Sequence, residues 1–384
     1  MTQQTQRQTS HTNLYVPALD GLRGLAVLVV FLSHASLVGY NPLPWIQFSG
    51  IGKMGVFLFF ILSSFLLTYP FLLKQEQAFS KNALINFSYR RFFRIYPLFV
   101  VYLLLAMGSS MVLTTVVHKE NVGIPFYLDG WEFIQHIFLQ QGKGVTWSIL
   151  VEFRYYFVLP LIAYVYGVLL RGGMLLSLGV TMLLIAIAQY ILPQSEALVN
   201  DPRLLPYAPV MLMGTIIAVF QYNYNTKWQI KPWMPIVQEI IGWIAGALLV
   251  LEIPMVWYTV MNGSSMCATH NLDIAEFSRL ECHKLFHHKF IENSVLWVVV
   301  LLGAVNGDRV LQKLFQSKAL GYMGKISFSF YLWHPCVLSV LHNVHLPIPD
   351  TLSFWLALFI TTVISHGSYK WIEVPSSKIQ YKPR

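Results

Sequence analysis

Charged residues are scarce in this sequence, because Asp, Glu, Lys and Arg together make up 11% of its 384 residues. An ordinary soluble domain carries about 25% charged residues. A folded protein of this size keeps a large wetted surface that so few charges cannot cover, which excludes an ordinary soluble domain. The hydrophobic fraction is 55%, and the mean hydropathy is +0.55. We therefore expect an all-α polytopic membrane protein whose surface is largely covered by lipid.

Internal repeats and low-complexity tracts are also absent from the sequence, and no appended soluble domain is expected. The first thirteen residues are polar, and the apolar run after them is long enough to remain as an anchor. We therefore expect no cleavable signal peptide. The formal net charge of +9 could suggest nucleic acid as a partner. The basic residues instead stand at the ends of apolar runs, which is typical of a positive-inside membrane topology, so no nucleic acid partner is expected.

Ten apolar runs approach the length of about 20 residues that a membrane-spanning helix needs. They are Leu19–Val38, Ile51–Leu73, Phe92–Val117, Trp147–Leu170, Met174–Leu192, Leu204–Phe220, Ile236–Trp257, Ile291–Asn306, Ala319–Leu341 and Leu352–Tyr369. The segment Trp131–Gln141 is amphipathic, which favours an interfacial helix over an eleventh span. The chain thus divides into an N-terminal tail (1–18), a transmembrane domain (19–372) with an outer loop at about 258–290, and a C-terminal tail (373–384).

The distribution of Lys and Arg predicts the orientation of these spans. With the N-terminus inside, the inner segments hold 18 of these residues and the outer segments hold seven, while Arg154 lies within a span. Because cytoplasmic segments carry the excess of positive charge, both tails are predicted to be cytoplasmic. The expected location is a bacterial inner or plasma membrane, in contact with membrane lipids.

The predicted outer loop contains Cys267 and Cys282. An oxidising exterior favours a disulfide between them, and two free thiols are the alternative. Cys336 falls in a span and is expected to be buried and inert. Four histidines share the loop at a spacing that fits no tight ligand template, so no metal site is expected. These histidines are His270, His283, His287 and His288.

Ionisable residues inside a membrane are costly and commonly mark functional sites. In the predicted spans they are His34, Glu152, Arg154, Glu239, Glu252, His334 and His366, with Arg23 at the inner edge. Arg23 and His34 are eleven residues apart, and three helical turns take about 10.8 residues. They therefore share a face, about 16 Å apart along the axis. Snorkelling or a hydrogen bond to a neighbouring helix explains either residue alone; together they suggest two ends of one inward-facing site.

Glu152 is predicted to lie at the same depth as His34. Each stands about five residues inside the outer end of its span, or roughly 7 Å deep. Equal depth would allow the carboxylate to orient the imidazole and raise its basicity. An ion pair between Glu152 and Arg154 is the alternative.

Three arginines, Arg90, Arg91 and Arg94, stand beside aromatic residues at the predicted cytoplasmic end of the third span. Such a cluster can bind anionic lipid headgroups. Guanidinium groups also bind phosphate bidentately and stack on rings, which suits a phosphorylated cytosolic donor such as coenzyme A.

Six motifs in the sequence resemble the membrane-bound acyltransferase-3 family, and they occur in the family's order. They are Leu19–Gly24 with Ser33-His34, Gly55–Ser63, Arg90–Pro97, Trp147–Glu152 with Tyr155-Tyr156, Ile326–Pro335 and Trp371–Pro375. Two residues depart from the family's pattern, and the C-terminal esterase-like domain that some members carry is not expected. Ser64 stands where the family usually has glycine, which would tighten that helix contact, and Arg154 adds an unusual charge beside Glu152.

The resemblance implies an enzyme that transfers an acyl group, usually acetyl, from cytosolic acyl-CoA to a hydroxyl of an extracytoplasmic or lipid-linked glycan. It implies essential roles for His34 and Arg23 and ties the three arginines to the acyl-CoA. Acetyl-CoA would be a co-substrate, with no permanently bound cofactor. We expect His34 to act as general base, oriented by Glu152 or by another acid, and Arg23 to line the donor entry. Direct transfer and an acyl-histidine relay are both open.

His334, Tyr331 and Trp147 are candidates to line the same cavity. For His334, the simpler alternative is a hydrogen bond to a neighbouring helix near Pro335. Two other functions compete: acyl transfer to a non-glycan small molecule, and proton-coupled transport of lipids or glycoconjugates that uses the intramembrane His and Glu. The absence of repeated halves disfavours a transporter. Nothing in the sequence indicates an oligomeric state.

Overall fold

The computed structural model describes residues 16–43, 45–112, 115, 128–198, 200–253, 289–307, 309–344, 346–379 and 381. Every regular element within these ranges is a helix. The longer helices are α2 (Pro17–Leu37), α3 (Gly52–Lys74), α4 (Lys81–Val112), α6 (Thr146–Tyr164), α7 (Met174–Ile191), α8 (Ala208–Thr226), α9 (Trp233–Leu251), α13 (Phe290–Asn306), α16 (Ser327–Val344) and α17 (Asp350–Ser368). The shorter ones are η1 (Gln75–Phe79), α5 (Gly130–Ile137), η3 (Val165–Leu169), η4 (Gln194–Glu196), η5 (Leu205–Tyr207), α14 (Val310–Phe315), α15 (Lys318–Lys325), η6 (Tyr369–Glu373) and α18 (Val374–Ser377).

Eight helical segments of the described chain are long and apolar enough to cross a membrane. They are Pro17–Leu37, Gly52–Phe79, Lys81–Ser109, Thr146–Leu169, Met174–Ile191, Leu205–Thr226, Trp233–Leu251 and Asp350–Ser377. Phe290–Asn306 is a shorter apolar helix. The predicted all-α polytopic fold is confirmed. The number of ten spans and the cytoplasmic location of both tails stay predictions.

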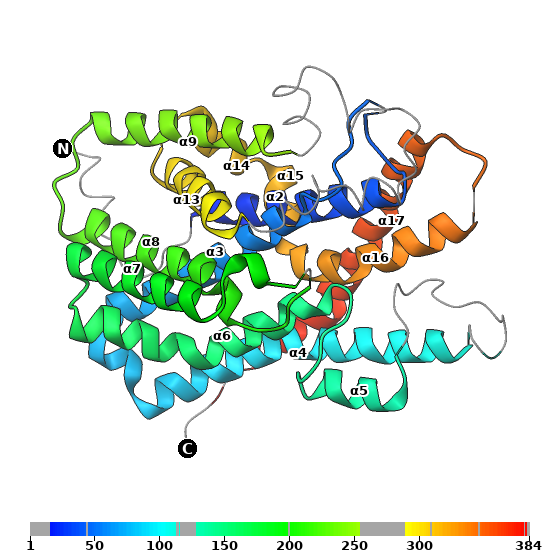
Figure 1. Ribbon diagram of the computed structural model, residues 1–384, viewed down its shortest axis with the longest axis horizontal. Coiled ribbons are helices and arrows are strands. Elements are labelled where there is room, and N and C mark those ends of the chain that lie inside the picture. The colour runs from blue at the N-terminus through cyan, green and yellow to red at the C-terminus, as the bar shows by residue number, and fades with distance from the viewer. Residues whose placement is uncertain are drawn as a thin grey trace.

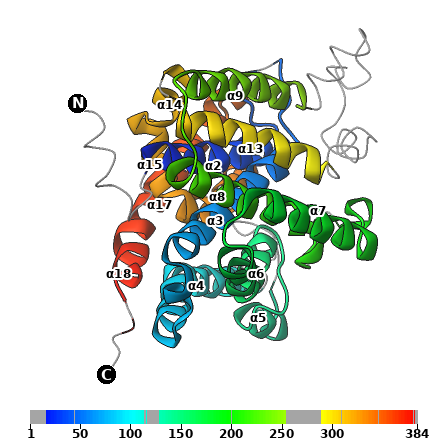
Figure 2. The same ribbon diagram turned by 90° about the vertical axis from the view of Figure 1, so that its left-hand side faces the viewer.

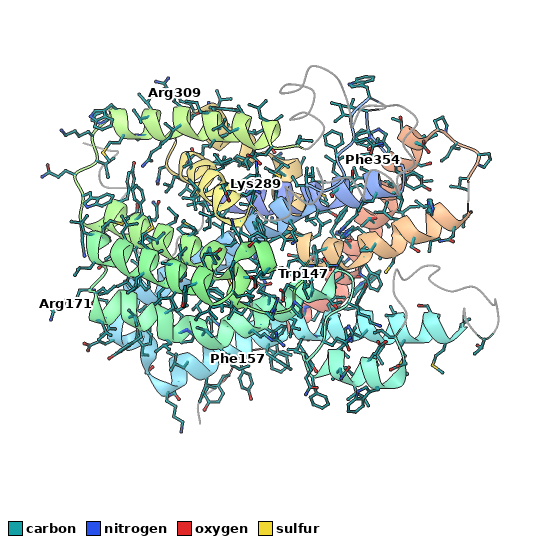
Figure 3. The ribbon with its side chains drawn as sticks, in the orientation of Figure 1. Trp147, Phe157, Arg171, Lys289, Arg309 and Phe354 are labelled. Atoms are coloured by element: carbon teal, nitrogen blue, oxygen red, sulfur yellow. The ribbon has the colours of Figure 1, made fainter. Side chains whose placement is uncertain are left out.

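Helices α2 and α3 lie in the middle of the bundle, with α9 and α13 on one side and α4 and α6 on the other (Figures 1 and 2). Large apolar side chains cover the outer surface, and the side chain of Phe157 on α6 is 82% exposed. Figure 3 shows Phe157 on the outer side of α6 and Arg171 at one end of the bundle. An apolar exterior is the arrangement expected of a protein in lipid.

Glycines allow α2 to lie almost backbone to backbone with α15. A Cβ atom placed on Gly24 would lie 2.1 Å from the carbonyl oxygen of Leu320. In return, a Cβ atom on Gly324 would lie 1.8 Å from the carbonyl oxygen of Asp20. Small residues at helix contacts permit such close approach in membranes. This contact fixes the end of α2 that carries Arg23.

Glycines also hold α3 between α2 and α8. A Cβ atom on Gly55 would lie 2.5 Å from the carbonyl oxygen of Ala26 on α2, and one on Gly214 of α8 would lie 2.4 Å from that of Ile61. Ser64 is fully buried at the contact with α8, where a Cβ atom on Gly214 would lie 2.7 Å from the Cβ atom of Ser64. Ser64 therefore fills the space between the two helices.

Two predicted helix boundaries are wrong. The run Ala319–Leu341 is not one helix, because α15 ends at Lys325 and α16 begins at Ser327. The hydrophobicity of a run indicates that its residues are shielded from water. It does not reveal where one helix ends and the next begins with a different axis. Helix α4 begins at Lys81, eleven residues before the predicted span, because helical structure continues where the hydrophobicity stops.

The segment predicted to form a separate amphipathic helix contains α5, which begins after a capping box formed by Asp129 and Glu132. Its position at the membrane interface stays a prediction. The predicted outer loop, with Cys267 and Cys282, falls almost entirely in 254–288, outside the described residues. Cys336 is a half-buried free cysteine of α16, and its inertness stays a prediction.

Candidate active site

His34 of α2 is hydrogen-bonded to His334 of α16. Its Nδ1 lies 2.7 Å from Nε2 of His334, and Nδ1 of His334 lies 3.2 Å from the carbonyl oxygen of Phe330. A carbonyl can only accept, so Nδ1 of neutral His334 carries the hydrogen and its Nε2 accepts from His34. The hydrogen-bond network thus assigns the proton of His34 to Nδ1 and leaves a lone pair on its Nε2.

Nε2 of His34 faces the first turn of α3. A Cβ atom placed on Gly52 would lie 4.0 Å from this nitrogen. The segment before α3 is held against α2 by hydrogen bonds from the backbone N–H of Gly50 to Ser33 Oγ (3.1 Å) and of Phe48 to Ser36 Oγ (2.9 Å). Gly50 has a φ of +93°, a conformation that favours glycine. The imidazole therefore lies beside a fixed stretch of backbone.

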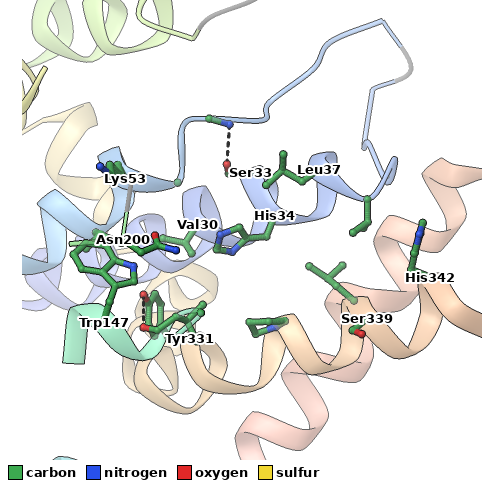
Figure 4. A pocket seen from close by; sticks show the side chains of 18 of the residues that line it. Val30, Ser33, His34, Leu37, Lys53, Trp147, Asn200, Tyr331, Ser339 and His342 are labelled. Atoms are coloured by element: carbon green, nitrogen blue, oxygen red, sulfur yellow. Dashed lines mark hydrogen bonds between the residues drawn. The ribbon is translucent and has the colours of Figure 1, made fainter. Parts of the chain in front are cut away.

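His34 lines a cavity of about 570 Å³, which we call the outer cavity. Figure 4 shows His34 near its middle, with Lys53, Asn200 and Trp147 on one side and Ser339 and His342 on the other. Two of the predicted lining residues, Trp147 and Tyr331, do line it. His334 is fully buried, and it contributes to the site through its hydrogen bond to His34.

Arg23 lines a second, smaller cavity of about 70 Å³, which we call the inner cavity. Arg94, Glu152 and Tyr156 also line it. Val56 and Tyr331 line both cavities, so the two adjoin each other. Arg23 and His34 of α2 thus lie at neighbouring cavities, Arg23 at the inner one and His34 at the outer one.

The predicted pairing of Glu152 with His34 is not the arrangement in the structure. Oε1 of Glu152 accepts hydrogen bonds from Ser63 Oγ (2.7 Å) and from Tyr156 OH (2.5 Å). The alternative partner, Arg154, donates to the carbonyl oxygen of Pro202 at 2.7 Å. Equal depth in the membrane does not fix the direction in which a side chain leaves its helix, and this is why the argument from depth failed. Glu152 belongs to the inner cavity.

The three arginines of the predicted donor site do not all face the same way. Arg94 lines the inner cavity, Arg91 is half-buried, and Arg90 is exposed. Nε of Arg91 and Nε of Arg23 are buried and have no hydrogen-bond partner among the described residues. Glu373 is close enough to Arg94 and Arg23 to interact electrostatically, and its carboxylate accepts hydrogen bonds from Ser329 of α16. The charged residues that line the inner cavity are thus two arginines, Arg23 and Arg94, and one carboxylate, Glu152.

Three site residues were missed by the sequence reasoning. Ser148 shares a 2.8 Å hydrogen bond with Tyr331, and Asn200 and Lys53 line the outer cavity. In the sequence, Lys53 is one of the seven Lys and Arg residues that the predicted topology assigns to outer segments. Its position at the start of an apolar run was the one available signal.

Residues 16–366 match the model of a family described as an acyltransferase domain, acyltransferase-3. The chain belongs to this family. It is 25% identical to the peptidoglycan O-acetyltransferase OatA of Listeria monocytogenes, over 97% of the chain and 57% of that protein. It is 23% identical to the O-acetyltransferase OatA of Staphylococcus aureus, over 96% of the chain and 58% of that protein. The chain thus spans less than two thirds of the length of these relatives. No solved structure matches it.

Proposed function

We propose that the chain transfers an acyl group, most simply acetyl, from cytosolic acyl-CoA to a hydroxyl of an extracytoplasmic or lipid-linked glycan. Membership of the acyltransferase family and the names of its O-acetyltransferase relatives support this reaction class. The observation that carries the proposal is the lone pair of His34 Nε2 at an outer cavity that adjoins an arginine-lined inner one.

The donor binds at the inner end of the bundle. Arg94 and Arg91, with Arg90 on the exposed side of α4, offer guanidinium groups to the phosphates of coenzyme A. Arg23 lines the way from there toward His34. At about 70 Å³ the inner cavity is too small for a pantetheine arm. Side chains on its wall, such as Phe59 and Tyr331, therefore move when the arm enters.

The chemistry needs one base, and His34 provides it. Nε2 removes the proton from the acceptor hydroxyl while the hydroxyl oxygen attacks the thioester carbonyl carbon. The tetrahedral intermediate collapses with breakage of the C–S bond, and the coenzyme A thiolate takes the proton from the imidazolium. The bond from Nδ1 to His334 keeps the ring oriented throughout. In an acyl-histidine relay the same Nε2 attacks the thioester first, so both routes depend on the same atom.

The test replaces the base. In vesicles loaded with acetyl-CoA, we expect His34→Ala to lower acyl transfer by at least about 100-fold, the lower range for general acid–base catalysis. His366→Ala is the matched control, because His366 is exposed and bonds Tyr322. Full transfer by His34→Ala would overturn the mechanism. Mass analysis of surface glycans from wild-type and deletion strains tests the acceptor class, because loss of acetyl groups supports O-acetylation and unchanged glycans contradict it.

A further inference from the structure

Lys53 is a buried cation in the outer cavity, and none of the described residues accepts a hydrogen bond from it. It is 7% exposed, and its Nζ atom has no hydrogen-bond acceptor in the part of the chain that the structure describes. The centroid of the Phe290 ring lies 5.2 Å from Nζ, which gives a cation–π contact. Burying an ammonium group without an acceptor costs several kcal/mol. A lysine that serves only as a topology signal extends to water instead.

Asp201 is the acid that interacts electrostatically with Lys53. Its carboxylate oxygens already accept hydrogen bonds from other groups. It accepts hydrogen bonds from the side chain and backbone N–H of Arg203 and from the backbone N–H of Leu198. Burial alone would raise the pKa of the Asp201 carboxyl, but these bonds hold the pKa below its ordinary value. Asp201 is therefore satisfied without Lys53.

The surroundings of Lys53 add to the positive potential. Lys53 stands in the first turn of α3, where backbone N–H groups have no partner within the helix and the helix dipole is positive. The described residues that line the outer cavity include no Asp or Glu. Figure 4 shows Lys53 beside Asn200 and Trp147, to one side of His34. An anion on this side would be stabilised by charge and by the helix end together.

We propose that Lys53 binds an anionic group of the acceptor, a carboxylate or a phosphate, while an acceptor hydroxyl lies at His34. This inference depends on the proposed function in one respect, which is that the reaction takes place at His34. The acceptor is then an acidic glycan or a glycan linked to a lipid through phosphate. Trp147 offers its ring to the sugar, and Asn200 offers an amide for hydrogen bonds. Neutral glycans leave the ammonium group unpaired and bind less tightly.

Binding of charged and neutral probes tests this proposal without turnover. The purified full chain is titrated with digalacturonic acid and its methyl ester, and with a polyprenyl-linked disaccharide with and without a diphosphate. We expect one charged probe to bind at least about tenfold more tightly than its neutral partner, as one charge-assisted hydrogen bond allows. Preference within the first pair identifies a carboxylate, and preference within the second pair identifies a phosphate.

Variants connect that preference to Lys53. Lys53→Met should abolish it, Lys53→Arg should keep most of it, and Lys143→Met, a change at a lysine paired with Glu132, should leave it intact. No preference in the wild type, or an equal preference in Lys53→Met, overturns the proposal. Acetyl transfer from acetyl-CoA to each probe is measured separately. Binding preference without transfer rejects the proposed function alone, and transfer without preference rejects the role of Lys53 alone.

Discussion

At the scale of single residues, His34 and His334 have different roles. His334 is fully buried and its two ring nitrogens are both engaged, one with Phe330 and one with His34. It cannot reach a substrate without breaking these bonds. His34 has one nitrogen at the outer cavity that bonds to none of the described residues. We therefore interpret His334 as a positioning residue that holds the tautomer and the orientation of His34.

His334→Ala removes the acceptor for Nδ1–H of His34 and should lower kcat by about 100-fold, while KM for acyl-CoA stays nearly constant. His334→Gln should recover part of kcat, because an amide oxygen can take the place of the accepting nitrogen. Steady-state kinetics of the purified chain check both results. If His334→Ala lowers the stability of the protein in proportion to its kcat, and His334→Gln does not recover kcat, His334 has a role in packing only.

The arginines of α4 should differ in their effects. Arg94→Gln should weaken acyl-CoA binding by about tenfold or more, the value of one charge-assisted hydrogen bond, because Arg94 lines the inner cavity. Arg90→Gln should weaken binding less, because Arg90 is exposed and water screens its charge. Equilibrium titration with acyl-CoA measures both. An equal loss of donor and acceptor binding in Arg94→Gln would point to a topology signal instead of a docking site.

Residue-level prediction from the sequence succeeded along one helix and failed between helices. Arg23 and His34 are separated by about three helical turns, so their placement on one helix, α2, was predictable. The contact of His34 with His334 joins residues 300 positions apart, and nothing in the periodicity of either helix indicates it. The same limit explains part of the incorrect pairing of Glu152, because its bond to Ser63 joins α6 to α3. Its bond to Tyr156 lies within α6, four residues along the helix, and was open to prediction.

At the scale of elements, the contact of α2 with α15 determines how Arg23 faces the inner cavity. Gly24→Ala places a methyl group where the carbonyl oxygen of Leu320 lies 2.1 Å away. The helices must separate, which should cost about 1–3 kcal/mol and lower the Tm in detergent. Gly321→Ala on α15 meets no atom within 4 Å and is the matched control. Equal Tm values for the two variants would contradict the close packing.

The helices themselves were largely predictable, because apolar runs in lipid leave few alternatives to a helix. The structure departs from prediction where hydrophobicity carries no information. Ile326 separates two helices within one apolar run, and the polar start of α4 continues a helix beyond the hydrophobic stretch. Directions and ends of helices depend on neighbours such as α2 and α17, which a single run of sequence does not specify.

At the scale of the whole molecule, the two cavities give the bundle a direction. The inner cavity lies at Arg23 and Arg94, and the outer one lies at His34, with Val56 and Tyr331 between them. The bias of Lys and Arg, 18 inner against seven outer, predicts that the arginine end faces the cytoplasm. Under the proposed function, donor and acceptor would approach from opposite sides and meet where the cavities adjoin.

Cysteine labelling tests this direction. In a chain whose three native cysteines are replaced by serine, Trp45→Cys lies in the exposed connection before α3 and Glu76→Cys lies in exposed η1 at the opposite end of that helix. A membrane-impermeant maleimide should label Trp45→Cys on intact cells and Glu76→Cys only after permeabilisation, because α3 crosses the membrane once between them. The cysteine-free chain provides the background. Labelling of Glu76→Cys on intact cells would show that the bundle has the opposite orientation. The arginines would then lie outside, where cytosolic acyl-CoA cannot reach them.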